Sequence, residues 1–202
     1  MRVQFVRSDH GAGYSALVLR EDGATVRLPG YDRTFRVPHD LAHFVTEREF
    51  GLDRGVFGCI AAGAMFANMS IVDGRTRYDA NGRSRAVLRA NSAELTLAES
   101  LSGVVHDAVE HRHDFPAVYR RLRNSWGALR TGPCPYTPGE LRQALDVLEQ
   151  LAQRWQALGP GGKLALRWEG GAAPVPGPGR NRAPATARRA VSGARRAGGV
   201  PA

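Results

Sequence analysis

One stretch of the chain, Gly55–Ala67, contains no charged residue at all. It lies in the run RGVFGCIAAGAMFANM, Arg54–Met69, which Asp53 can cap as a helix. Small residues recur in it every four positions: Gly55, Cys59, Gly63 and Ala67. A helix that is apolar on every side must be buried, and small residues at this spacing let another helix or a sheet approach its backbone. We therefore expect a central core helix here, and favour packing over close approach to a ligand.

The residues before this stretch follow the two-residue period of β-strands. Arg2–Val6 alternates, and Leu17–Leu28 contains two alternating runs separated by a turn at Gly23, which predicts a hairpin. Thr34–Val37 is a candidate for a further short strand. Lys163–Trp168 alternates again after a glycine-rich turn, and we expect this last strand to return and pair with the N-terminal ones.

Helical patterns fill most of the remaining body. Thr96–Glu99 matches a capping box at the start of a helix, and a shorter helix is expected from Phe115 to about Leu129. Thr137–Glu140 combines a capping box with a proline at the first helical position. Residues 73–91 are polar and rich in arginine and turn signals. The chain is thus predicted to form an α+β domain: a small N-terminal antiparallel sheet joined by a C-terminal strand, packed against four or five helices that include the buried Gly/Ala-rich one.

The composition changes sharply after Glu169. Residues 170–202 contain no acidic and no aromatic residue, and such a segment cannot offset a backbone entropy cost of roughly 1–2 kcal/mol per residue. We therefore expect one domain over residues 1–169 and a disordered Gly/Ala/Pro/Arg-rich tail over 170–202. The tail carries six arginines of a net charge of +9. The simpler interpretation is a compositionally biased terminus; the alternative is weak electrostatic contact of this tail with nucleic acid or acidic surfaces.

Several classes of protein are disfavoured by what the sequence lacks. Cys59 and Cys134 are far apart and in no C-x-x-C spacing, so neither a disulfide framework nor a cysteine zinc site is indicated. No apolar run is long enough for a signal peptide or a membrane span, and we expect a soluble cytoplasmic protein. The P-loop, dinucleotide-binding and serine-hydrolase motifs are missing as well. Whether the protein is an enzyme is left open.

The stretch VPHDLAHFVTEREFG, Val37–Gly51, carries the most suggestive chemistry. On a helix, His39, His43 and Glu47 span about 80° of the side opposite the apolar residues Leu41, Phe44 and Val45. Imidazoles four residues apart can both reach one metal ion at about 2.0–2.1 Å, and a carboxylate one turn later can supply a third ligand. The trio is therefore a candidate site for a divalent metal such as zinc.

The same stretch departs from the H-E-x-x-H signature of zinc hydrolases. In those enzymes the middle glutamate is the general base. Asp40 has a shorter side chain and follows Pro38 in the first helical turn, where the helix dipole already accounts for a carboxylate. A zinc protease is thus disfavoured. The simplest alternative is a helix start whose histidines lie on a solvated or second-layer face.

A second group of histidines lies in VVHDAVEHRHD, Val104–Asp114. His106 and His111 are further candidate metal ligands, although they project in different directions from the expected helix. The pattern is also similar to that of metal phosphohydrolases with H…HD…D ligands, but it is short and common. For His113 and Asp114 a solvated helix end is the better explanation.

The run VPHDLAHFVTEREFGL followed by GVFGCIAAGAMFANM resembles an uncharacterised bacterial family known only as hypothetical proteins, over Met1–Glu169. The resemblance implies no activity, substrate, cofactor or residue role. Two functions therefore stay open. The first is a non-enzymatic interaction or accessory protein, which we favour because it requires no site. The alternative is a metal-binding or metal-dependent protein that uses His39, His43 and Glu47.

Overall fold

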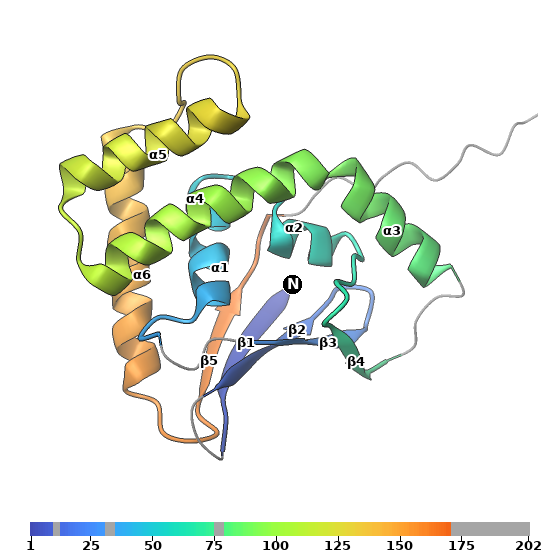
Figure 1. Cartoon of the computed structure of the whole chain (residues 1–202). Coiled ribbons are helices and arrows are strands. Elements are labelled where there is room, and N and C mark those ends of the chain that lie inside the picture. The colour runs from blue at the N-terminus through green and yellow to red at the C-terminus, as the bar shows by residue number, and fades with distance from the viewer. Residues whose placement is uncertain (10–12, 31–34, 75–78, 171–202) are drawn as a thin grey trace, which may run out of the picture.

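The computed structural model describes residues 1–9, 13–30, 35–74 and 79–170, and Figure 1 shows the chain. The strands are β1 (Arg2–Arg7), β2 (Tyr14–Leu19), β3 (Thr25–Pro29), β4 (Ser70–Asp73) and β5 (Lys163–Arg167). The helices within the described ranges are α1 (His39–Glu49), α2 (Val56–Ala61), α3 (Ala80–Ala90), α4 (Ser92–His111), α5 (Phe115–Leu129) and α6 (Pro138–Gln156). None of these helices is long and apolar enough to cross a membrane.

The strands form one antiparallel sheet in the order β4-β3-β2-β1-β5. Alternation places Val3 and Phe5 of β1 on the buried face, where Phe5 lies opposite Ala16 of β2 and Leu164 of β5. The helices lie on this one side of the sheet (Figure 1). The predicted α+β fold, with a C-terminal strand that joins an N-terminal sheet, is confirmed.

Helix α1 is the central helix of the fold. Every residue from Leu41 to Glu47 is buried, because α1 packs against α4 and α6 as well as against the core. Aromatic rings connect it to its surroundings: the ring of Phe44 lies 6.2 Å from that of Phe5, 5.2 Å from that of Phe57 and 5.6 Å from that of Trp168. The predicted core positions of this helix, Leu41, Phe44 and Val45, are fully buried.

The predicted glycine-rich helix is shorter than expected. Its buried part is α2, whose residues Phe57–Ile60 are buried, but the helix ends at Ala61 because Gly63 adopts a left-handed φ of 101°. A side chain at Gly58, which is not part of the predicted small-residue stripe, would collide with the backbone carbonyl of Asp53 in the segment just before α2. The residues that follow lead into β4, a strand that the pattern did not predict.

Other boundaries also differ from expectation. The polar stretch 73–91 contains α3, and α4 begins at Ser92, so Thr96 lies inside the helix and donates its hydroxyl to the Ser92 carbonyl (3.0 Å). Phe35–Val37 forms no strand, and Thr34 lies outside the described residues. In contrast, the capping box of α6 is confirmed: the Thr137 hydroxyl accepts from the Glu140 amide. The expected tail falls almost wholly in residues 171–202, outside the described ranges.

Candidate metal centre

Helices α1 and α4 bring three potential metal ligands together. His39 begins α1, His43 follows one turn later, and Glu99 faces both from α4. His43 Nε2 lies 3.0 Å from Glu99 Oε2, and His39 Nε2 lies 3.7 Å from Glu99 Oε1. One potential ligand atom from each of the three residues lies within 4.8 Å of the other two. Two imidazoles and one carboxylate thus converge on one point.

Glu47 occupies the other side of His43. Its carboxylate is fully buried and accepts three hydrogen bonds: from the Val56 amide (2.8 Å), from the Phe57 amide (2.9 Å) and from His43 Nδ1 (3.1 Å). Gly55 makes room for this arrangement, because a Cβ there would collide with the Glu47 carboxyl group. Glu47 therefore orients His43 and connects it to the start of α2, whereas Glu99 faces the Nε2 atoms.

The charges of this cluster depend on one another. Burial by itself lowers the pKa of His43, but hydrogen bonds to Glu47 and Glu99, together with their negative charges, outweigh it and raise the pKa to about 9. The hydrogen bond to His43 lowers the pKa of Glu99; burial opposes this, and the charges of His43 and His39 add to it. Without a metal ion, His43 is an imidazolium held between two carboxylates.

His106 is the third imidazole near this point. It lies on α4 two turns after Glu99, is buried, and its ring is 5.4 Å from that of His39. Its Nε2 lies 2.9 Å from the carbonyl oxygen of Val37, and since a carbonyl can only accept, this nitrogen carries a proton. The ring of His39 on α1 thus lies beside the ring of His106 on α4. The Nε2–H group of His106, however, donates to the carbonyl of Val37 in the segment before α1.

His111 belongs to a separate cluster near the end of α4. His111 Nε2 and His113 Nε2 lie 3.3 and 3.4 Å from the two carboxylate oxygens of Asp107, and Arg121 of α5 lies 2.5 Å from the same group. The rise of an α-helix puts His111 about 18 Å along the axis from Glu99. His111 and Glu99 therefore cannot share one ion. Burial raises the pKa of Asp107, but the Arg121 hydrogen bond and charge, aided by the histidines, hold it below its usual range.

The sequence pattern did not single out Glu99 as a ligand. The Thr96–Glu99 pattern predicts a capping box, but α4 begins at Ser92, which places Glu99 in the second turn of the helix. A signal was nevertheless present, because Glu99 and His106 are seven residues apart and therefore lie on the same face of one helix.

Comparison with known proteins finds no matching family model, no matching curated protein and no matching solved structure. The assignment of this site therefore depends on its geometry and chemistry alone.

Proposed function

We propose that the protein binds one divalent metal ion through His39 Nε2, His43 Nε2 and the carboxylate of Glu99. The observation that carries this proposal is the convergence of these three groups, within 4.8 Å of one another, from two helices that pack side by side. This keeps the two histidines expected from the sequence and puts Glu99 in the place of Glu47.

The contacts of His43 support a metal ligand rather than an isolated ion pair. Metal-bound histidines commonly donate their second ring N–H to a carboxylate, which fixes the tautomer and directs the other nitrogen at the metal. Glu47 is such a carboxylate, and two backbone amides hold it in place. A divalent ion would replace the proton on Nε2 of His43, while the Nδ1–H group would keep its hydrogen bond to Glu47.

The ligand set favours zinc, and is compatible with iron or manganese. Imidazole suits zinc and iron, and a carboxylate suits these metals and manganese. The side chains of His39 and Glu99 are 30% and 64% exposed, so the site opens to solvent. Three protein ligands leave a coordination position for water or another small ligand, the arrangement found in catalytic rather than structural zinc sites. This exposure indicates that a bound ion would be reachable from solution.

The interaction function expected from the sequence has weaker support. It was favoured because it requires no site, and its electrostatic part rests on residues 171–202, which lie outside the described ranges. The metal site, in contrast, is supported by contacts among residues that the structure describes. We therefore place metal binding first.

Metal binding is tested on purified, untagged full-length protein that has been treated with a chelator. Titration with Zn²⁺ by calorimetry, and with Co²⁺ by visible absorption, should give one ion per chain. At a free metal concentration of 100 times Kd, binding should raise the free energy of unfolding by about 2.7 kcal/mol. His43→Gln and Glu99→Gln should each abolish the Co²⁺ spectrum.

The matched control is His113→Gln, which removes an exposed histidine that also lies beside a carboxylate. It should bind Zn²⁺ and Co²⁺ as the wild type does. Stoichiometric binding that persists in both the His43 and the Glu99 variants, or no binding by the wild type, would disprove the site.

A further inference from the structure

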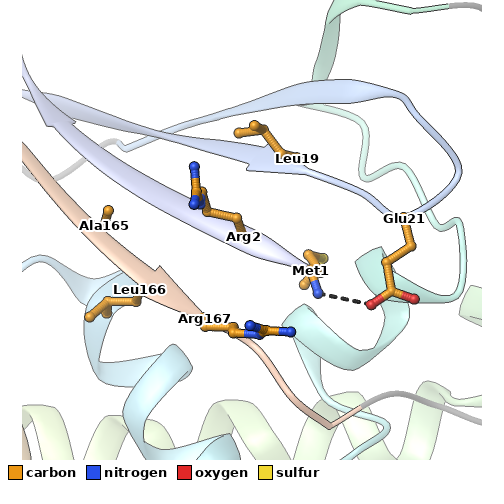
Figure 2. A pocket seen from close by; sticks show the side chains of 7 residues that line it. All are labelled: Met1, Arg2, Leu19, Glu21, Ala165, Leu166 and Arg167. Atoms are coloured by element: carbon orange, nitrogen blue, oxygen red, sulfur yellow. Dashed lines mark hydrogen bonds and ion pairs between the residues drawn. The ribbon is translucent and has the colours of Figure 1, made fainter.

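A cavity of about 650 Å³ lies at one end of β1 and β5, and none of its lining residues belongs to the histidine cluster (Figure 2). Arg2 and Arg167 line it together with the apolar side chains of Leu19 and Ala165, whereas the side chain of Met1 is buried in the core. Figure 2 shows Arg2, Leu19 and Ala165 on the side of the sheet away from the helices. Its volume is in the range of pockets that hold small molecules, roughly 300–1,000 Å³.

The two arginines of this cavity are direct neighbours across two strands. Arg2 lies opposite Arg167 in the antiparallel register, so both side chains leave the sheet on the same face, with Cβ atoms about 4.5–5.5 Å apart. Like charges placed directly opposite each other destabilise a sheet. An anion between the two guanidinium groups would remove this repulsion and gain hydrogen bonds from both.

Neither guanidinium group has a strong partner within the described residues. The side chain of Arg2 makes no hydrogen bond or ion pair with any residue that the structure describes. Arg167 Nε has a single contact of 3.8 Å with Glu169, and because both side chains are highly exposed, that pair contributes little. The carboxylate in the cavity, Glu21, is already engaged by the Met1 ammonium group at 3.1 Å. Figure 2 draws this ion pair between Met1 and Glu21, with the Arg2 side chain pointing away from it.

We propose that this cavity binds a small phosphate-bearing molecule of nucleotide size. Guanidinium groups present a planar fork of donors that matches phosphate oxygens, so Arg2 and Arg167 would hold the phosphate between them. Leu19 and Ala165 would contact the less polar part of the ligand. The site is independent of the metal centre, because no residue is shared between the two.

The test is calorimetry of the full-length protein with two probes, pyrophosphate and adenosine diphosphate, at constant ionic strength and without metal. Saturable binding of one molecule per chain is expected. Arg2→Gln and Arg167→Gln should each weaken it about tenfold or more, since each removes hydrogen bonds to a charged group. Tighter binding of adenosine diphosphate than of pyrophosphate would show that the apolar lining contributes.

Arg27→Gln is the matched control, because Arg27 is exposed on the same sheet but lies two strands from Arg2 and does not line the cavity. It should change affinity by no more than about twofold, as screened charges do at this distance. A second readout guards against misfolding: without ligand, Arg167→Gln should raise the thermal midpoint because the repulsion is gone. Equal losses in all three variants, unchanged affinity in the two cavity variants, or binding only of long oligonucleotides would each overturn the proposal.

Discussion

The chain places histidines beside carboxylates in two regions, and the two differ in almost every physical respect. His43 is buried between Glu47 and Glu99, where α1 packs against α4. His111 and His113 are 54% and 42% exposed and share Asp107 with Arg121. Both regions stand out in the sequence because several histidines lie close to acidic residues. Only the first arranges its ligand atoms around a single point.

The difference shows what burial adds to a polar cluster. A buried charge must be fully paired, and the Glu47 carboxylate meets this demand with two backbone amides and one imidazole. Its geometry is therefore fixed before any metal arrives. Around Asp107, water can solvate every charge, so the side chains gain little from holding one arrangement. Preorganisation thus distinguishes the two clusters, and each prediction below tests that distinction.

The largest expected effect is that of Glu47→Ala. This change leaves the amides of Val56 and Phe57 without their acceptor and the His43 imidazolium paired with Glu99 alone, so the free energy of unfolding should fall by about 3–5 kcal/mol. Urea unfolding followed by circular dichroism measures the loss. Glu47→Gln, which keeps the volume and one acceptor oxygen, should lose less. A loss below about 1 kcal/mol for Glu47→Ala, as for an exposed ion pair, would remove the contrast between the two regions.

A second expectation concerns the stability of the metal-free protein at alkaline pH. The pKa of His43 is raised from 6.5 to about 9 in the folded state. Its contribution is therefore fully present below pH 6.5 and is lost as the pH rises through 9, a loss on the order of 3 kcal/mol. Unfolding free energies between pH 6 and pH 10, in chelator-treated protein, measure it. The slope should be absent in His43→Gln; an identical slope in that variant would assign the effect to another group.

A third, smaller effect is the change in stability when alanine replaces either of two glycines, Gly55 or Gly103. A Cβ at Gly55 would collide with the Glu47 carboxyl group, so Gly55→Ala should destabilise the protein by about 1–3 kcal/mol. A Cβ at Gly103, inside α4, would meet only open space. Gly103→Ala should therefore raise the free energy of unfolding by about 0.4–1 kcal/mol through helix propensity. Thermal unfolding of both variants makes the comparison. The same sign for both would show that the room beside Glu47 is not constrained.

The sequence was informative wherever a local rule acts alone. The alternation of β1, β2 and β5, the capping box at Thr137 and the spacing of His39 and His43 all depend on a few neighbouring residues. Helix α2 is shorter than predicted because Gly63 adopts a left-handed φ. The four residues of β4 are all exposed, and this strand depends on its pairing with β3, which lies far away in the sequence. The predicted small-residue stripe includes Gly63, although a glycine is also a local signal for the end of a helix.

In the candidate site, too, some residues follow from local helical geometry and others depend on how the helices pack. The two histidines could be predicted because both lie on one helix, and their shared face follows from helical geometry. Glu99 could not be paired with them, because that requires the register of α4 against α1, which no local rule supplies. The spacing of Glu47 one turn after His43 predicts a third metal ligand. In the structure, the chain folds back at Gly55, and the Glu47 carboxylate accepts hydrogen bonds from the start of α2 instead.

The smallest expected effect is at the exposed cluster. Asp107→Asn keeps the shape of the side chain and removes its charge, so the free energy of unfolding at pH 7 should fall by less than about 1 kcal/mol. Because the folded-state pKa of Asp107 is lowered, its contribution is present above the unfolded-state pKa and is lost as the pH falls through the folded one. A double-mutant cycle of Asp107→Asn with Arg121→Gln, at low and high salt, measures the coupling. That coupling should shrink as salt rises, since exposed charges are screened and buried ones are not. A coupling of about 2 kcal/mol or more, insensitive to salt, would mean that the cluster is preorganised too and that burial does not separate the two regions.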